Sequence, residues 1–258
     1  MSESRELWAV TVALPHEAAA LRAHFRGGAQ TRYRHLTVTE GRLGDREALL
    51  AVTGMGPERA GEAARFLFAQ YPVTHLVSTG YCGGLQPGLV CGDAVLAERC
   101  AFAAEPQGGW LCDLPLLRRA EEALRLADIP TRLGTLLTSS KPVLKAAEKE
   151  LLGARTGAAG VDMESAAILR EAAGSGKKIA SVTVRFIVDA LQDELADTGP
   201  FLDENAGVKP LRLARELLRR PKLFQELPDL GRKAARARDG LTRFLGRFFG
   251  LGGAQNQS

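Results

Sequence analysis

The chain has few cysteines, four in 258 residues, and no two of them have the C-x-x-C spacing of a zinc or redox site. Cys82, Cys91, Cys100 and Cys112 also lie far from any cluster of histidines, so the sequence predicts neither a metal site nor a disulfide framework. No run of about 18 apolar residues is present, and the apolar stretch Leu7–Leu14 is too short for the core of a signal peptide. We therefore expect a cytoplasmic protein with reduced thiols.

Charge is unevenly spread along the chain. Residues 207–258 contain 12 Lys or Arg and 4 Asp or Glu, a net +8, whereas residues 1–206 contain 22 and 26, a net −4. The basic character therefore belongs to the C-terminal part. Because contacts to nucleic-acid phosphates come mainly from Lys and Arg, an acidic main body predicts no nucleic-acid partner.

Stretches of strand length alternate with stretches of helical period over most of the chain. Alternating strands and helices indicate an α/β fold with a largely parallel or mixed sheet, here in one domain over residues 1–206. The expected strands are 7–14, two within 36–56, 74–80, 93–103, 131–139 and 178–189, and the expected helices are 16–25, 57–71, 113–127, 141–152 and one from about 161 to 174.

Residues 207–258 form an expected helical extension, interrupted at Pro221 and Pro228. One stripe of this extension is apolar at helical spacing and consists of Leu241, Phe244, Leu245, Phe248 and Phe249. The stripe is explained by packing on the main domain or on a partner subunit. A second hypothesis is a helix lying in a membrane interface, since Arg residues flank the apolar stripe.

Two glycine-rich loops follow expected strands. Residues 53–61, TGMGPERAG, offer the backbone of Gly54 and Gly56 to a phosphate or a ribose, and residues 78–88 expose the backbone around Tyr81, Cys82 and Gly83. A dinucleotide-binding site is disfavoured, because the next strand lacks the acid that holds an adenosine ribose. An NAD-dependent oxidoreductase is thus a weak alternative.

Acidic residues stand at the ends of two expected strands, where ligands collect in open α/β sheets. Glu17 follows the first strand, and it is also explained as a glutamate favoured in the first turn of a helix. Asp189 ends the apolar strand 178–189, four residues after Arg185, and a carboxylate buried there is unfavourable unless something binds it. Position alone favours the helix explanation for Glu17, so at this point Glu17 and Asp189 are candidate site residues and Arg185 is a candidate binding residue.

The stretch GVDMESAAI, residues 160–168, places two acids beside a helix that is otherwise apolar. Asp162 is explained equally well as a helix cap or as a ligand-binding residue. A capped helix needs only one acid, so Glu164 is predicted to face a substrate, and the flexible thioether of Met163 can cover a flat ring.

Together these motifs resemble the nucleoside phosphorylase and nucleosidase superfamily, especially its methylthioadenosine/S-adenosylhomocysteine nucleosidase branch. The resemblance runs in order through ALPHEAAAL, TGMGPERAG, TGYCGGLQPGLVCGD, GVDMESAAI and VRFIVDA, over roughly residues 7–195. It implies a single-domain fold with a mixed, partly barrel-like sheet flanked by helices. It also implies a protein that needs no cofactor or metal and forms a homodimer.

The resemblance implies a role for each acid in breaking a purine N-glycosidic bond. By motif position Asp189 resembles the acid that protonates the base, and Glu164 resembles the ligand of the ribose hydroxyls, with Met163 beside the sugar. Glu17 resembles the glutamate that activates the attacking water. Burial would supply the raised pKa that the acid at position 189 needs.

The chain departs from the family pattern at several positions. Tyr81 and Cys82 stand where the nucleosidase branch has a small or hydroxyl residue, and Val188 replaces the serine that commonly precedes the aspartate. The first loop lacks the G-x-P-x-R arrangement that phosphorylases use for phosphate, and Glu17 would repel phosphate there. Hydrolysis is therefore favoured over phosphorolysis.

Residues 79–93, TGYCGGLQPGLVCGD, and the segment VDMES are similar to the hopanoid-biosynthesis-associated phosphorylase subgroup, which removes adenine from adenosylhopane. A hopane-linked adenosine is therefore the favoured substrate, and a lipid-linked nucleoside fits a membrane-seeking C-terminal helix. The alternatives are a methylthioadenosine/S-adenosylhomocysteine nucleosidase, a futalosine hydrolase and a phosphate-dependent purine nucleoside phosphorylase. A nucleoside-binding sensor without turnover is the non-enzymatic alternative.

Overall fold

A mixed sheet of eleven strands forms the centre of the computed structural model, which describes residues 6–22, 24–193 and 223–251. Five strands close into a barrel, because the short β10 pairs in parallel with β9 and antiparallel with β6. These five are β6 (His75–Gly84), β11 (Ala180–Asp189), β7 (Ala94–Phe102), β9 (Thr131–Thr138) and β10 (Gly160–Asp162).

The remaining strands extend the sheet on one side of the barrel. From β6 the order continues through β1 (Leu7–Val12), β5 (Arg46–Val52), β4 (Leu36–Leu43) and β2 (Phe25–Arg26), while β3 (Gln30–Tyr33) pairs with β4 and β8 (Trp110–Leu111) pairs with β7. This architecture confirms the expected α/β fold with a mixed, partly barrel-like sheet.

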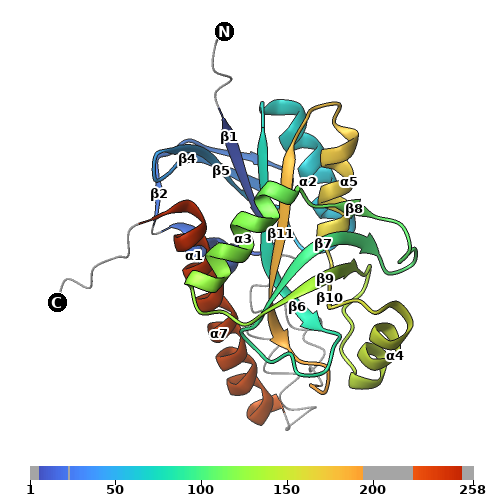
Figure 1. Cartoon of the computed structure of the whole chain (residues 1–258). Coiled ribbons are helices and arrows are strands. Elements are labelled where there is room, and N and C mark those ends of the chain that lie inside the picture. Colours follow the sequence, from blue (N-terminus) through green and yellow to red (C-terminus); the bar gives the residue numbers. More distant parts are fainter. Residues whose placement is uncertain (1–5, 23, 194–222, 252–258) are drawn as a thin grey trace, which may run out of the picture.

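Helices cover both faces of the sheet (Figure 1). One face carries α1 (Pro15–Arg22), α3 (Leu114–Leu126) and α7 (Leu223–Phe249), and the other carries α2 (Pro57–Gln70) and α5 (Ser165–Gly174). A further helix, α4 (Ala146–Thr156), lies at the β9–β10 side of the barrel. Since both faces are covered, the strands are apolar on both sides: Val184 and Phe186 of β11 enter one core and Ile187 the other.

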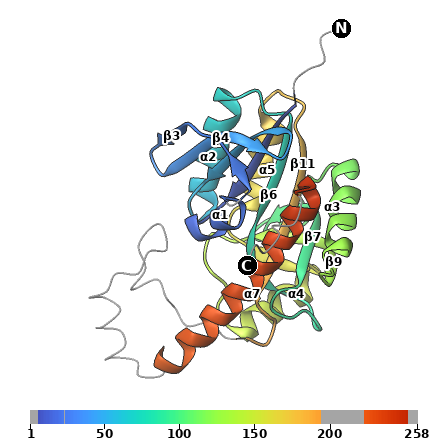
Figure 2. The same ribbon diagram turned by 90° about the vertical axis from the view of Figure 1, so that its left-hand side faces the viewer.

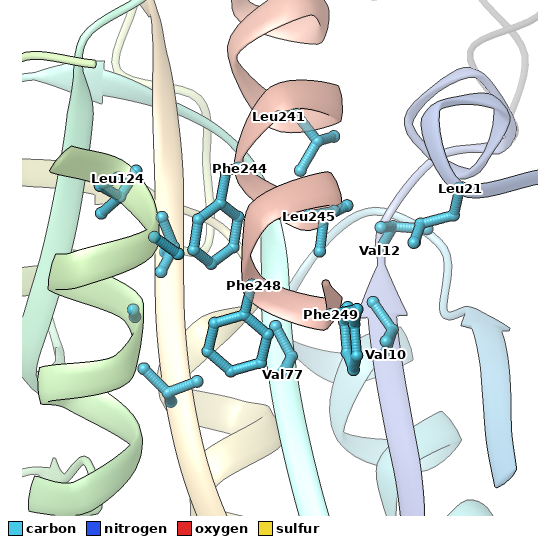
Figure 3. Close-up of a cluster of buried hydrophobic side chains, with 14 of the residues drawn as sticks. Val10, Val12, Leu21, Val77, Leu124, Leu241, Phe244, Leu245, Phe248 and Phe249 are labelled. Atoms are coloured by element: carbon cyan, nitrogen blue, oxygen red, sulfur yellow. The ribbon is translucent and has the colours of Figure 1, made fainter. Parts of the chain in front are cut away.

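The apolar stripe of α7 packs into the core between the sheet, α1 and α3 (Figures 2 and 3). All five of its side chains, Leu241, Phe244, Leu245, Phe248 and Phe249, are at most 2% exposed. The helix ends where Gly250 adopts a φ of 63° and the N–H of Leu251 donates to Gly246 O at 2.8 Å. The structure thus uses the stripe for packing within the chain, and these side chains do not face a membrane in this fold.

Several boundaries differ from the sequence-based expectation. Helix α5 begins at Ser165 instead of near Val161, because Gly160–Asp162 is recruited as strand β10. The short strands β2, β3 and β8 were not expected, and α7 runs through Pro228, where an interruption was predicted. A proline in a helix interior removes one hydrogen bond and destabilises the helix by about 3 kcal/mol or more, and the buried stripe of this 27-residue helix offsets that loss.

The predicted boundary at residue 206 and the helical pattern of residues 207–222 lie outside the described residues. In the part that is described, no helix combines the length and apolarity needed to cross a membrane.

Candidate active site

The carboxyl end of β6 brings the predicted residues together because two glycines leave room for side chains beside it. A Cβ atom at Gly80 would lie 2.5 Å from Arg185 Nη1 and 2.7 Å from Glu17 Oε1. Gly80 also has a φ of 139°, which side-chain-bearing residues rarely adopt. At Gly83 a Cβ would lie 3.1 Å from Asp189 Oδ2. Gly80 and Gly83 are three residues apart on β6, so Glu17 and Asp189 each pack against a glycine of the same strand.

Glu17 is buried at the start of α1, with 2% of its surface exposed. Its Oε2 accepts a hydrogen bond from Leu14 N at 2.8 Å, and its Oε1 accepts one from Tyr81 N at 3.0 Å. Burial raises the pKa of the Glu17 carboxyl, although the nearby Arg185 opposes this shift. The side chain is thus fixed by backbone donors of the segment between β1 and α1 and of β6, and it can hold a proton more readily than an ordinary glutamate.

Glu164 is the second buried carboxyl group and lies directly before α5. Its Oε1 accepts a hydrogen bond from Gly56 N at 2.9 Å, and its Oε2 lies 4.0 Å from Arg185 Nη2. Burial, together with the negative charge of Asp162, raises the pKa of Glu164 to about 8. The predicted glycine loop therefore contributes a backbone donor to an acid of the site, and Glu17 is close enough to Glu164 to interact with it electrostatically.

Arg185 is a fully buried cation among these acids. Its Nε donates to Asp162 Oδ2 at 2.8 Å and to Ser165 Oγ at 3.1 Å, and its Nη1 donates to the Thr79 carbonyl. Burial lowers the pKa of Arg185, but the surrounding carboxylates outweigh burial and leave the pKa raised. Arg185 therefore keeps its charge and offsets the negative charge gathered around it.

Asp162 is held entirely by protein donors. Its Oδ1 accepts from Thr138 Oγ1 at 2.7 Å, and its Oδ2 accepts from Arg185 and from the backbone N–H of Ser165 at 3.1 Å. The contact with Ser165 N helps to satisfy the first turn of α5, so Asp162 has the capping function considered from the sequence. These contacts explain its burial without a ligand, and direct substrate binding by Asp162 remains a prediction.

Asp189 lies at the end of β11 and forms an ion pair that the sequence did not indicate. Lys149 Nζ, on α4, donates to Asp189 Oδ2 at 2.8 Å, and both side chains are at least 95% buried. Burial raises the pKa of Asp189, while the hydrogen bond and charge of Lys149 act in the opposite direction. No local pattern distinguishes Lys149 from the exposed Lys141 and Lys145 of the same segment, because its burial depends on where α4 packs.

The other predicted residues lie nearby with different exposures. Met163 is half-buried, and the N–H of Gly54 donates to Ala13 O at 3.0 Å. Burial, with Asp162 and Asp189 adding to it, raises the pKa of the Cys82 thiol well above its ordinary value.

Tyr81 contributes its backbone N–H to Glu17, but its ring turns toward the core that contains α7 and stacks on His16, with the ring centroids 5.6 Å apart. Its buried hydroxyl has no hydrogen-bond partner within the described part of the chain. Substrate binding by the Tyr81 ring therefore remains a prediction.

The arrangement is suited to proton transfer. The structure gathers Glu17, Glu164 and Arg185 at one end of the glycine stretch of β6 and Asp189 at the other. Among the residues described, no three His, Cys, Asp or Glu side chains group as a metal site requires. Buried carboxyl groups with raised pKa values can donate or accept protons near neutral pH.

Comparison with known proteins places this site in a family. A curated relative from Mycobacterium tuberculosis, a 5'-methylthioadenosine/S-adenosylhomocysteine nucleosidase, is 35% identical over 90 residues, which is 35% of each chain. The nucleosidase of the same name from Geobacillus kaustophilus is 30% identical over 122 residues, 45% of this chain and 52% of that protein. A DeoD-type purine nucleoside phosphorylase from Bacillus subtilis is 28% identical over 139 residues, 50% and 59% of the two chains. The chain thus spans between about a third and three fifths of the length of these relatives.

Solved structures share the fold over nearly the whole chain. The 5'-methylthioadenosine/S-adenosylhomocysteine nucleosidase of Neisseria meningitidis, in complex with methylthio-immucillin-A, superposes with a TM-score of 0.70 at 19% identity and covers 93% of this chain and 98% of that chain. The futalosine hydrolase of Helicobacter pylori superposes with a TM-score of 0.73 at 15% identity and covers 96% and 98%. The family model of the phosphorylase superfamily matches residues 8–219. The chain therefore belongs to the phosphorylase superfamily.

Proposed function

We propose that the protein is a nucleosidase that hydrolyses the N-glycosidic bond of an adenine nucleoside and releases adenine. The observation that carries the proposal is the placement of three buried carboxyl groups, Glu17, Glu164 and Asp189, along the glycine-rich end of β6. Membership in the phosphorylase superfamily supports the same class of reaction.

In the proposed reaction each carboxyl group acts on a different part of the substrate. Asp189 donates a proton to the purine as the bond between the sugar and the base breaks and the base takes up the bonding electrons. Glu164 binds the ribose hydroxyls, and its ionised form, which a pKa of about 8 makes the major form only at alkaline pH, stabilises the positive charge that develops on the sugar. Glu17 accepts a proton from the water that attacks the anomeric carbon.

Water is favoured over phosphate as the nucleophile because of the charges near Glu17. A phosphate ion beside Glu17 would meet two further carboxyl groups, those of Glu164 and Asp162, and Arg185 is already paired with Asp162. A phosphate site needs cationic donors that are free to bind it. Hydrolysis requires only a water molecule at this position.

For the substrate we propose a hopane-linked adenosine, on the basis of the motifs in residues 79–93 and 161–165. The C-terminal helix does not add support, because its apolar stripe is buried against α1, α3 and the sheet. Peripheral membrane contact and a homodimer remain hypotheses. Vesicle co-sedimentation and sedimentation velocity of the full-length protein test them.

A substrate panel tests the proposed function. Methylthioadenosine, S-adenosylhomocysteine, inosine, futalosine and adenosylhopane are incubated with the full-length protein, with and without phosphate, and free base is quantified by chromatography. We expect base release that does not depend on phosphate and is fastest with one of the adenine nucleosides. Strict dependence on phosphate would identify a phosphorylase, and tight binding without base release would identify a nucleoside sensor.

A further inference from the structure

Lys149 is a buried cation to which the proposed reaction gives no part. Its side chain is 0% exposed, and its Nζ donates at 2.8 Å to Asp189 Oδ2 and at 2.6 Å to the backbone carbonyl of Ala190. Both acceptors belong to the end of β11, so Lys149 binds the segment that carries the proposed acid. An ammonium group is rarely buried without such partners, because removing it from water is unfavourable.

The position of Lys149 is fixed by close packing of α4. One turn further along this helix, Gly153 lies so near the backbone of Leu85 that even a single added carbon would overlap the Leu85 carbonyl. Leu85 directly follows β6, the strand that contains Gly80 and Gly83. Helix α4 is therefore held against the same strand that separates the proposed catalytic acids, and it presents Lys149 at a defined distance from Asp189.

The contacts of Asp189 are asymmetric. Within the described residues, Oδ2 receives the hydrogen bond from Lys149, and no hydrogen bond to Oδ1 is formed. Gly83 lies beside the carboxyl group and has no side chain that would cover it. The oxygen that Lys149 does not bind is therefore left for a ligand.

Other charged groups around Asp189 balance one another. Asp193, in the following loop, and Lys233, on α7, both interact electrostatically with Asp189, but they form an ion pair with each other at 3.0 Å. The thiols of Cys82 and Cys91 are also close enough to interact with it. Lys149 is the charged group that makes direct contact with the Asp189 carboxyl in the described structure.

We propose that Lys149 is a positioning residue that holds Asp189 by Oδ2, directs Oδ1 toward the purine, and stabilises the carboxylate left after proton transfer. The inference rests on the proposed nucleosidase function. In the step concerned, the proton moves from Asp189 to a ring nitrogen of the base, and the electrons of the glycosidic bond pass to the base. The carboxylate that forms is paired with the ammonium of Lys149. Glu17 releases the proton it takes from water to solvent, and Asp189 takes up a proton from solvent before the next turnover.

The expected electrostatic effect has a definite direction. A positive charge within hydrogen-bonding distance lowers the pKa of a carboxyl group by about 1–3 units. Burial raises the pKa of Asp189, and the contacts with Lys149 are the largest effects that oppose this rise. Without Lys149, Asp189 stays protonated to higher pH but is a weaker acid toward the purine.

The test compares Lys149→Met and Lys149→Arg with the wild type. Lys145→Met is the control, because Lys145 is exposed and lies one turn earlier in the same segment. The pH dependence of kcat is measured together with the 13C titration of the Asp189 carboxyl, assigned with Asp189→Asn. For Lys149→Met we expect the titration midpoint and the alkaline limb of kcat to move up by about 1–3 pH units. We also expect kcat at neutral pH to fall about tenfold with little change in KM, as for a group that acts in the transition state.

Lys149→Arg keeps the positive charge and is expected to leave the midpoint and the limb close to those of the wild type, as is Lys145→Met. A folded Lys149→Met protein with an unmoved midpoint and limb would overturn the proposal. If Lys149→Met does not fold, an Arg variant with an altered limb contradicts the role of the charge. Absence of base release by the wild type would refute the proposed function alone, since the carboxyl titration still tests the effect of Lys149 on Asp189.

Discussion

Replacing Glu164 with glutamine should stabilise the protein at alkaline pH and leave its stability unchanged at acidic pH. Burial and the charge of Asp162 raise the pKa of Glu164 from 4.5 to about 8. The folded state therefore binds this proton more tightly than the unfolded state does. The associated stability is fully present below pH 4.5 and is lost as the pH rises through about 8.

The magnitude follows from the same shift. The two pKa values differ by about 3.5 units, and each unit corresponds to about 1.36 kcal/mol, so ionised Glu164 lowers the free energy of unfolding by on the order of 5 kcal/mol. Glutamine stays neutral, and its amide oxygen can still accept the hydrogen bond from Gly56 N. We expect Glu164→Gln to gain a few kcal/mol over the wild type at pH 9.5 and almost nothing at pH 4.

Urea unfolding of both proteins at the two pH values measures this difference. A matched control is Glu171→Gln in the same helix, where two hydrogen bonds from Arg65, at 2.9 Å each, lead to a lowered pKa for Glu171 in spite of partial burial. That variant should lose stability at pH 9.5, by less than about 1 kcal/mol because Arg65 is exposed. An equal gain for Glu164→Gln at both pH values, or no gain at pH 9.5, would refute the argument.

Three further substitutions test the fold and the site. Phe248→Ala should lower the free energy of unfolding by about 3–5 kcal/mol, because this residue of α7 is 2% exposed and packs in the core. Denaturant unfolding measures the loss, and a change below about 1 kcal/mol would contradict the packing of this helix. Arg185→Met leaves the buried Asp162 without its cation and should lower stability by about 3–5 kcal/mol, which thermal unfolding monitored by circular dichroism detects. Gly80→Ala should displace Glu17 and Arg185, since the added carbon would lie 2.7 Å or less from each, and kcat/KM should fall by about 100-fold while the protein stays folded. An active Gly80→Ala variant would show that the placement of Glu17 is not essential.

Much of the fold could be predicted because its strands and helices carry strong local patterns. Six of the ten residues from Ala180 to Asp189 are apolar and three of these are valines, which is typical of a strand, and the spacing of Leu241 and Phe244 marks the buried side of α7. The partly barrel-like sheet was expected only from the family resemblance and not from local patterns, because β10 has only three residues and its pairing with β6 depends on contacts distant in the sequence.

The acids of the site could be predicted from ordered motifs, but the groups that hold them could not. Glu17, Glu164 and Asp189 stand at strand ends or helix starts, where the sequence signals a site. Lys149 is the single lysine of α4 and follows the exposed Lys141 and Lys145, so its burial follows only from the packing of α4. The sequence also could not show that the Asp162 carboxylate accepts hydrogen bonds from Thr138 and Arg185.

The most direct test of the proposed chemistry is the rate of adenine release by the wild type and by Asp189→Asn, with the best substrate of the panel. Asparagine preserves the shape of the side chain but cannot donate the carboxyl proton. If Asp189 protonates the base, kcat should fall by about 100-fold to 10,000-fold while nucleoside binding persists. Release of adenine by Asp189→Asn at a rate close to that of the wild type would contradict the account.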